Sequence, residues 1–219
     1  MSTTTLFVWH GDGREQAVAI LEAIDEWSQS NEVLMTVGSG PERGGKFMDV
    51  ISQVRPDTMV EFGGYIGYSA IKFGNAVRSS GGKRYISLEG NAEYAELARK
   101  LVTLAGLDEF VEIIVGPISE YLAKLRERKI DVDVFFIDHD ESLYASDLKL
   151  ADGLGLVRKD CWVLADNIVG DRTRDYRELL GPANDDLRGL NRAQTYETSV
   201  FYFDLPTGKK DGLMLSRRL

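Results

Sequence analysis

Several residue types are scarce in this sequence, and each scarcity excludes a class of protein. A single cysteine, Cys161, among 219 residues excludes an internal disulfide and fits a reducing compartment, so we expect a cytoplasmic protein. Basic residues are also in deficit. The sequence has 26 Lys and Arg residues but 35 Asp and Glu residues. The resulting formal net charge of −9 argues against binding to nucleic acid. No uncharged apolar run reaches the roughly 18 residues of a membrane-spanning helix, and residues 1–13 lack the basic start and apolar stretch of a secretory signal.

The remaining composition is that of an ordinary globular protein. Apolar residues make up 43% of the chain, which is enough for one sizeable core in a single domain. We expect residues 1–56 to form a helical cap and residues 57–219 a sheet core. In the cap, apolar residues recur at helical spacing over 14–29, a glycine-rich break covers 37–45, and a short helix is expected over 46–53.

From residue 58 onward, short apolar runs alternate with longer helical patterns. The runs predict strands over 58–62, 84–89, 111–115, 134–138 and 161–166, followed by helices over 67–77, 93–105, 118–126, 143–156 and 176–180. Five strand–helix units in series imply an α/β fold with a doubly wound, mostly parallel sheet and helices on both faces. The tail, 198–205 and 212–217 around a turn at Pro206, predicts a hairpin at one edge of the sheet.

Acidic residues stand at the carboxyl ends of four of these strands. They are Glu61, Glu89, Asp138 and Asp166. Ligands bind at this edge of a doubly wound sheet. An unpaired carboxylate is costly at a buried strand end, so we expect ligands or cations there.

A glycine-rich loop follows the first strand. Gly63 and Gly64 would let the backbone approach a ligand closely, and Gly67 would let the following helix pack tightly. Tyr65 stands where a dinucleotide-binding loop has its middle glycine, which argues against a diphosphate ligand. Glu89 can accept hydrogen bonds from both hydroxyls of a ribose. The glycine-rich loop and Glu89 together predict an adenosine-containing ligand without a diphosphate. The alternatives are that the loop is an ordinary strand–helix turn and that Glu89 is a solvated acid at a strand end.

A second group of polar residues follows the fourth and fifth strands, which should be neighbours. Asp138, Asp166 and Asn167 would then converge, and their oxygens suit Mg²⁺ or Ca²⁺. Two close acids without a cation would raise each other's pKa, and the 166–170 stretch contains no basic residue to neutralise them. Helix capping by Asp166 and Asn167 is the alternative.

Five stretches of the chain carry a family resemblance. They are LEAID at 21–25, VEFGGYIGYSA at 60–70, AGL at 105–107, FIDH at 136–139, and LVRK at 156–159 leading to LADN at 164–167. Together they resemble the catechol O-methyltransferase family, within the class I S-adenosylmethionine-dependent methyltransferases. The resemblance implies a seven-stranded Rossmann-like sheet whose last hairpin contains one antiparallel strand.

The resemblance also implies a site for S-adenosylmethionine and a site for Mg²⁺. Glu89 would bind the ribose, Met35 and Val37 would lie near the methyl-bearing sulfonium, and Ser119 and His139 near the adenine. The other positions implied around the cofactor are Glu61, Gly63, Tyr65, Tyr68, Ser69 and Asp138. The magnesium ligands implied are Asp138, Asp166 and Asn167, and the ion would bind two adjacent substrate oxygens and lower the pKa of the attacking hydroxyl.

The chain departs from the family pattern on the substrate side. Glu141 stands where similar enzymes have a lysine that accepts the proton, so Glu141 is the candidate catalytic base. An ionised Glu141 would nevertheless disfavour a catecholate nearby. Asp140 and Asp171 replace apolar wall residues, and with Glu141 they predict an acidic rim and a cationic or strongly polar substrate. Solvated loop acids are the alternative.

The sequence therefore predicts a magnesium-dependent O-methyltransferase that acts on a small hydroxylated molecule, catechol-like or polar, as a monomer or homodimer. One alternative is a catalytically weak S-adenosylmethionine-binding protein that serves as a binding or regulatory module, to which the missing lysine points. The other is a nicotinamide-dependent dehydrogenase, which the missing middle glycine and the paired acids disfavour.

Overall fold

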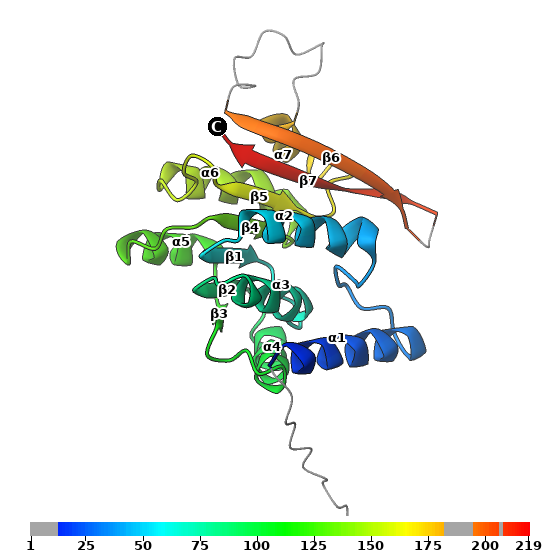
Figure 1. The fold of residues 1–219 in the computed structure, drawn as a ribbon. Helices are drawn as coiled ribbons and strands as arrows, with labels where there is room; N and C mark the ends of the chain where they lie inside the picture. The colour runs from blue at the N-terminus through cyan, green and yellow to red at the C-terminus, as the bar shows by residue number, and fades with distance from the viewer. Residues whose placement is uncertain (1–12, 182–194, 206–207) are drawn as a thin grey trace, which may run out of the picture.

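A seven-stranded sheet runs through the computed structural model, which describes residues 13–181, 195–205 and 208–219 (Figure 1). The strands lie in the order β3 (Val111–Val115), β2 (Arg84–Glu89), β1 (Thr58–Phe62), β4 (Val134–Ile137), β5 (Trp162–Ala165), β7 (Lys210–Arg218) and β6 (Tyr196–Asp204). Pairing is parallel from β3 to β5, and β7 is antiparallel to both of its neighbours. The predicted doubly wound sheet and its edge hairpin with one antiparallel strand are confirmed.

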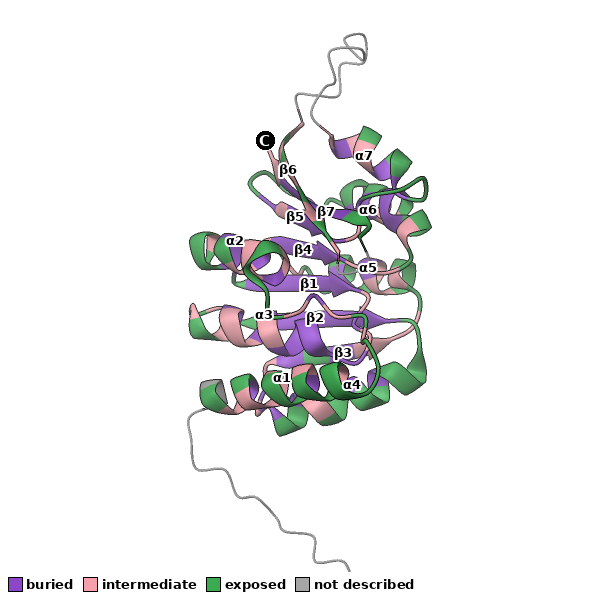
Figure 2. Cartoon of the chain, turned by 90° about the vertical axis from the view of Figure 1, so that its right-hand side faces the viewer, coloured by how far each residue is buried: buried purple, intermediate pink, exposed green. Residues whose placement is uncertain are grey.

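Helices cover both faces of the sheet, and the central strands β1, β2, β4 and β5 are almost entirely buried (Figure 2). On one face, apolar side chains of four helices join a single core cluster: α1 (Gly13–Ser30), α2 (Lys46–Val54), α3 (Tyr68–Ser79) and α4 (Ala92–Leu104). A second cluster on the other face includes side chains from α5 (Ile118–Glu127), α6 (Tyr144–Gly153) and α7 (Arg174–Leu180). No helix in the described ranges is long and apolar enough to cross a membrane.

The main departure from the expected elements lies in the glycine-rich break. Residues Pro41–Gly45 form a π-helical turn that runs directly into α2, and the Gly45 N–H donates to the carbonyl of Gly40 at 3.1 Å. A second difference is the helix expected over 143–156, which ends at Gly153 and is preceded by a 3₁₀ turn over Glu141–Leu143. The turn expected at Pro206 and the first twelve residues of the expected cap lie outside the described residues.

The strand register sets which loops meet. Phe62 pairs with Leu88 in β2 and with Ile137 in β4, and Ile137 pairs with Ala165 in β5. The residues that follow these four strands therefore lie side by side at one edge of the sheet.

Candidate functional site

A cavity of about 860 Å³ opens at this edge of the sheet. Its lining includes most of the positions expected around the cofactor: Met35, Val37, Gly63, Tyr65, Tyr68, Ser69, Glu89, Ser119, Asp138 and His139. It also includes Glu141 and Asn167. Glu61 and Asp166 have no exposed surface and lie behind the lining. The residues singled out from the sequence thus surround one hollow.

The glycine loop is shaped by contacts within the chain. Gly63 has φ +90°, and a Cβ there would lie 2.4 Å from the carbonyl oxygen of Asp138. A side chain at this position would therefore collide with the chain after β4, and Gly63 also lines the cavity, so the expected close approach of a ligand to its backbone stays a prediction. Tyr65, at the place of the middle glycine, has φ +44°, so the loop needs a left-handed residue there although the residue is not glycine.

Glu89 holds the glycine loop against the end of β2. Its Oε2 accepts from the backbone N–H groups of Gly64, at 3.0 Å, and Tyr65, at 2.7 Å, and its Oε1 accepts from the N–H of Asn91 at 2.7 Å. A carboxylate offers about four acceptor sites, so one site on Oε1 remains for a ligand hydroxyl. The sequence predicts only the ligand-binding role of Glu89. It does not predict that Glu89 holds the loop, because the donors are backbone N–H groups and no particular side chain marks them.

Glu61 is a fully buried carboxylate beneath the cavity. Neither of its oxygens makes a hydrogen bond of good geometry, although the hydroxyls of Ser69, Ser87 and Tyr85 lie near enough to lower its pKa. Burial outweighs them and raises the pKa of Glu61 to about 7. Such an unpartnered group is costly and points to a ligand-binding region.

The segment before α2 forms the opposite wall of the cavity and is tied to α3. The Tyr68 hydroxyl donates to Asp25 of α1 at 2.9 Å, and the Lys72 ammonium donates to the carbonyl of Gly38. Val37 is buried at 2% exposure, whereas Met35 is 73% exposed. Both wall positions expected near the sulfonium therefore lie on a stretch without secondary structure that Lys72 of α3 holds through the Gly38 carbonyl.

His139 lies among aromatic rings at the far end of the cavity. Its ring stacks on Tyr144 with centroids 5.1 Å apart and meets the edge of Phe62 at 5.7 Å. Nε2 lies 2.9 Å from a carboxylate oxygen of Asp147, while the buried Nδ1 has no partner within the described chain. Ser119 is exposed at the start of α5 and lines the same hollow. This end can accept a flat heterocycle.

The acidic cluster after β4 and β5 includes two residues that the sequence did not reveal. Arg43 donates from Nε and Nη2 to Oδ2 of Asp166, at 2.7 and 2.6 Å. The Asn167 amide donates to Asp211 at 2.6 Å. The 166–170 stretch contains no basic residue, as predicted, and the guanidinium that pairs with Asp166 comes from a distant segment.

Burial and mutual repulsion both act on this cluster. Burial first, and Asp166 second, raise the pKa of Asp138 well above its usual range. Burial also raises the pKa of Asp166, against the opposing effect of Arg43. Three carboxyl groups, those of Asp138, Asp166 and Asp211, thus lie around one guanidinium, so acidic groups outnumber basic ones at this site.

This excess bears on whether a metal ion fits. Two carboxylates and an amide oxygen are hard donors of the kind that Mg²⁺ takes. Within the described ranges, no three His, Cys, Asp or Glu side chains are arranged to hold an ion, so the trio of Asp138, Asp166 and Asn167 relies on its amide as third donor. The charge and the donor type fit a divalent cation, while Arg43 already engages Asp166.

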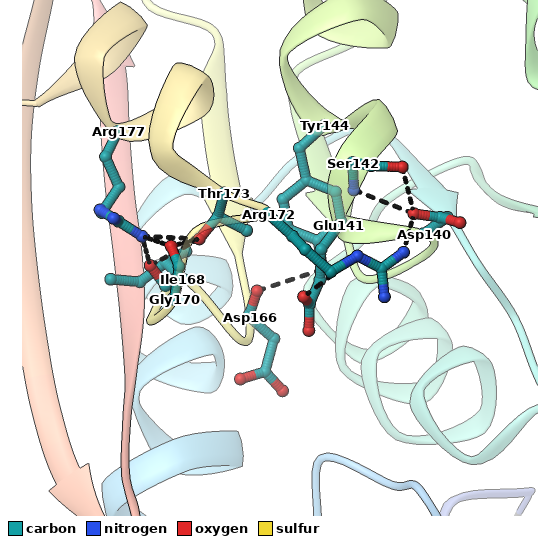
Figure 3. A network of polar contacts seen from close by, with 10 residues as sticks. All are labelled: Asp140, Glu141, Ser142, Tyr144, Asp166, Ile168, Gly170, Arg172, Thr173 and Arg177. Carbon is teal, nitrogen blue, oxygen red and sulfur yellow. Dashed lines mark hydrogen bonds and ion pairs between the residues drawn. The ribbon is translucent and has the colours of Figure 1, made fainter.

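The rim of the cavity is less acidic than the sequence suggests. Figure 3 shows Arg172 reaching from the loop after β5 to Asp140, at 2.5 Å, and toward Glu141, at 3.9 Å. Asp171 pairs with Arg174 at 2.5 Å. Two arginines therefore compensate part of the charge of the three acids in the predicted rim. Exposed apolar side chains also stand around the opening: Val33, Met35 and Leu143.

The loop that carries Asn167 is fixed by one side chain. Arg177 donates from Nη1 to the carbonyls of Ile168 and Gly170 and to the Thr173 hydroxyl (Figure 3). In addition, the Tyr144 hydroxyl donates to the backbone carbonyl of Asp166 at 3.2 Å. These contacts position the acidic cluster without using its side-chain oxygens.

Comparison with known proteins identifies the family. A protein-family model described as a methyltransferase domain matches residues 60–168 of the sequence. Catechol O-methyltransferase B of Danio rerio is 33% identical over 89% of this chain and 70% of its own length. Catechol O-methyltransferase of Mus musculus is 35% identical over 72% of this chain, and the chain spans 59% of that relative.

A solved structure supports the same fold. An O-methyltransferase from Bacillus cereus in complex with SAH matches with a TM-score of 0.68, covering 98% of this chain and 94% of that one at 20% identity. These likenesses leave the dehydrogenase alternative without support. The chain belongs to the catechol O-methyltransferase family of class I, S-adenosylmethionine-dependent O-methyltransferases.

Proposed function

We propose that this protein transfers the methyl group of S-adenosylmethionine to a hydroxyl of a small molecule that carries neighbouring oxygens, with Mg²⁺ held by Asp138, Asp166 and Asn167. One observation carries the proposal. A single cavity is lined both by the glycine loop with Glu89 and by Asp138, Asn167 and Asp211 of the acidic cluster. Donor and acceptor can therefore occupy adjoining parts of one hollow.

In this proposal, the chain positions the cofactor mainly through backbone and aromatic contacts. The remaining acceptor site on Glu89 takes a ribose hydroxyl. The adenine lies toward His139 and Ser119, and the sulfonium faces Met35 and Val37. Holding the methyl group in line with the acceptor oxygen can supply about 7–11 kcal/mol of the barrier.

At the acceptor end, a bound Mg²⁺ would supply Lewis acidity that lowers the pKa of the substrate hydroxyl. Glu141 lines the cavity with a side chain that is 33% exposed, and in this role it accepts the hydroxyl proton. Arg172 restrains it at the opening. The apolar side chains of Val33, Met35 and Leu143 favour an apolar ring or chain beside the substrate oxygens, rather than a cationic group.

The variant Asn167→Gly tests the acceptor end. Glycine tolerates the φ of +54° at this position, so the change removes the amide without adding backbone strain. We expect methyl transfer to a catechol panel, followed with radiolabelled cofactor, to fall at least 100-fold, while calorimetry shows S-adenosylhomocysteine binding within about threefold of wild type. Asp171→Asn, at an 89% exposed side chain, is the control and should keep full activity.

Full activity in Asn167→Gly, or turnover that persists in a metal chelator, would refute the magnesium assignment.

A second candidate function is that of a catalytically weak cofactor-binding protein. Two observations favour it: Glu141 occupies the position of the expected lysine, and Arg43 engages Asp166. Cofactor binding without transfer to any acceptor, with or without Mg²⁺, would support this second candidate.

A further inference from the structure

Arg43 reaches the acidic cluster from a part of the chain that precedes the sheet. It lies in the Pro41–Gly45 turn, 123 residues before Asp166. Two of its nitrogens bind the same oxygen of Asp166, and Nη1 donates to the carbonyl of Thr36 at 3.1 Å. The guanidinium is thus clamped between β5 and the cavity wall that contains Met35 and Val37.

These contacts engage two of the oxygens that a metal ion would need, Oδ2 of Asp166 and the side-chain oxygen of Asn167. Oδ2 of Asp166 accepts from Arg43, and its Oδ1 accepts from the N–H of Asn167 at 2.9 Å. The side-chain oxygen of Asn167 lies 3.5 Å from Nη2 of Arg43, and its amide nitrogen donates to Asp211. Of the three proposed ligands, Asp138 alone makes no contact with the guanidinium among the hydrogen bonds of the described chain.

Two glycines with open space around them precede the turn that carries Arg43. Gly38 and Gly40 precede the turn, and a Cβ at either position would meet no atom within 4 Å. Gly38 also has φ +65°, a conformation that glycine leaves at little cost. A rotation about these two residues, with loss of the Lys72 contact to the Gly38 carbonyl, would withdraw the arginine from Asp166.

We propose that Arg43 and a divalent cation compete for the oxygens of Asp166 and Asn167, so that the ion binds only when the Pro41–Gly45 turn withdraws the guanidinium. This inference rests on the proposed function, because it takes the same three residues as the ion site. Arg43 is then a positioning residue: it fills the site with a protein cation when no ion is bound, and it sets the affinity for the ion.

Mn²⁺ binding to the full chain without cofactor or substrate tests the competition. We expect Arg43→Gln to bind Mn²⁺ at least tenfold more tightly than wild type by calorimetry, because the site loses its internal competitor. Arg43→Lys keeps the charge and should retain weak, wild-type-like binding. Arg172→Gln is the matched control, since it removes an equal charge that contacts Asp140 and Glu141 instead. Its affinity should change by less than about threefold.

Hydrogen exchange on the wild-type protein provides a second measurement, independent of whether the variants fold. Saturating Mn²⁺ should speed amide exchange over residues 36–45 as the turn is released. Unchanged or slower exchange there, or equal Mn²⁺ affinity in Arg43→Gln and wild type, would overturn the competition. If wild type also binds Mn²⁺ and transfers methyl groups, the proposed function would stand. If no variant binds Mn²⁺ at all, both the competition and the magnesium assignment fail.

Discussion

Glu61 is the residue whose ionisation should be most visible in the stability of this protein. Burial raises its pKa from 4.5 to about 7 in the folded chain. The folded state therefore holds a proton that the unfolded state releases between these values. The stabilisation that this proton provides is complete below pH 4.5 and is lost as the pH rises to about 7, and its size is about 3 kcal/mol. The variant Glu61→Gln should not show this decrease in the free energy of unfolding as the pH rises. Above pH 7 it should therefore be more stable than wild type.

Denaturant unfolding measured from pH 5 to pH 8 checks this prediction. Glu89→Gln is the control, because Glu89 is a neighbouring carboxylate that accepts three backbone N–H groups. It should be less stable at every pH and should keep most of the wild-type pH-dependent loss, because the charge of Glu89 is the smallest of the effects that act on the pKa of Glu61. Parallel curves for wild type and Glu61→Gln would show that Glu61 does not take up the proton.

At the scale of elements, the close approach of α3 and α4 depends on the residue before α3. Gly67 has φ +88°, and a Cβ there would lie 3.0 Å from the Cβ of Ala98 in α4. Gly81, in the turn after α3, has φ +92° and open space around it, so it carries the backbone strain without the packing conflict. We expect Gly81→Ala to cost about 1 kcal/mol. Gly67→Ala should cost at least about 1 kcal/mol more, because helix α3 must shift.

The difference between the two variants, measured by denaturant unfolding, isolates helix packing from backbone strain. Equal losses would mean that α4 adjusts freely and that the glycine serves only the turn. Because Gly67 also ends the loop that Glu89 holds, Gly67→Ala should weaken binding of S-adenosylhomocysteine, whereas Gly81→Ala should not.

Across the whole molecule, local patterns predict the elements but not the partners of the acidic cluster. The strands at 58–62, 84–89 and 111–115 match the sequence prediction residue for residue, because short runs rich in apolar and β-branched residues mark each of them. Arg43 and Asp211 lie 123 and 44 residues from their partners, in segments with no periodic pattern. The sequence indicates such partners only indirectly, because acidic residues gathered at buried strand ends require a compensating cation without showing which residue supplies it.

The same separation in sequence explains how the cavity is built, and it leads to a prediction for the whole molecule. One wall is the stretch 33–37, and the other is formed by loops of the sheet, such as 63–67. A ligand between them joins two parts of the chain that can open separately. At 100 times its dissociation constant, S-adenosylhomocysteine should add about 2.7 kcal/mol to the free energy of unfolding.

Hydrogen exchange then shows where that energy acts. Protection by S-adenosylhomocysteine should appear over both 33–37 and 63–67, because local opening of either wall must first release the ligand. Residues 153–160, which do not line the cavity, serve as the internal control and should gain less protection. Protection confined to the sheet loops would mean that the ligand does not touch the stretch 33–37, and that Met35 and Val37 do not face the sulfonium. A gain over 33–37 as large as over 63–67 would place the cofactor between the two walls, which is the arrangement that methyl transfer to the acidic end requires.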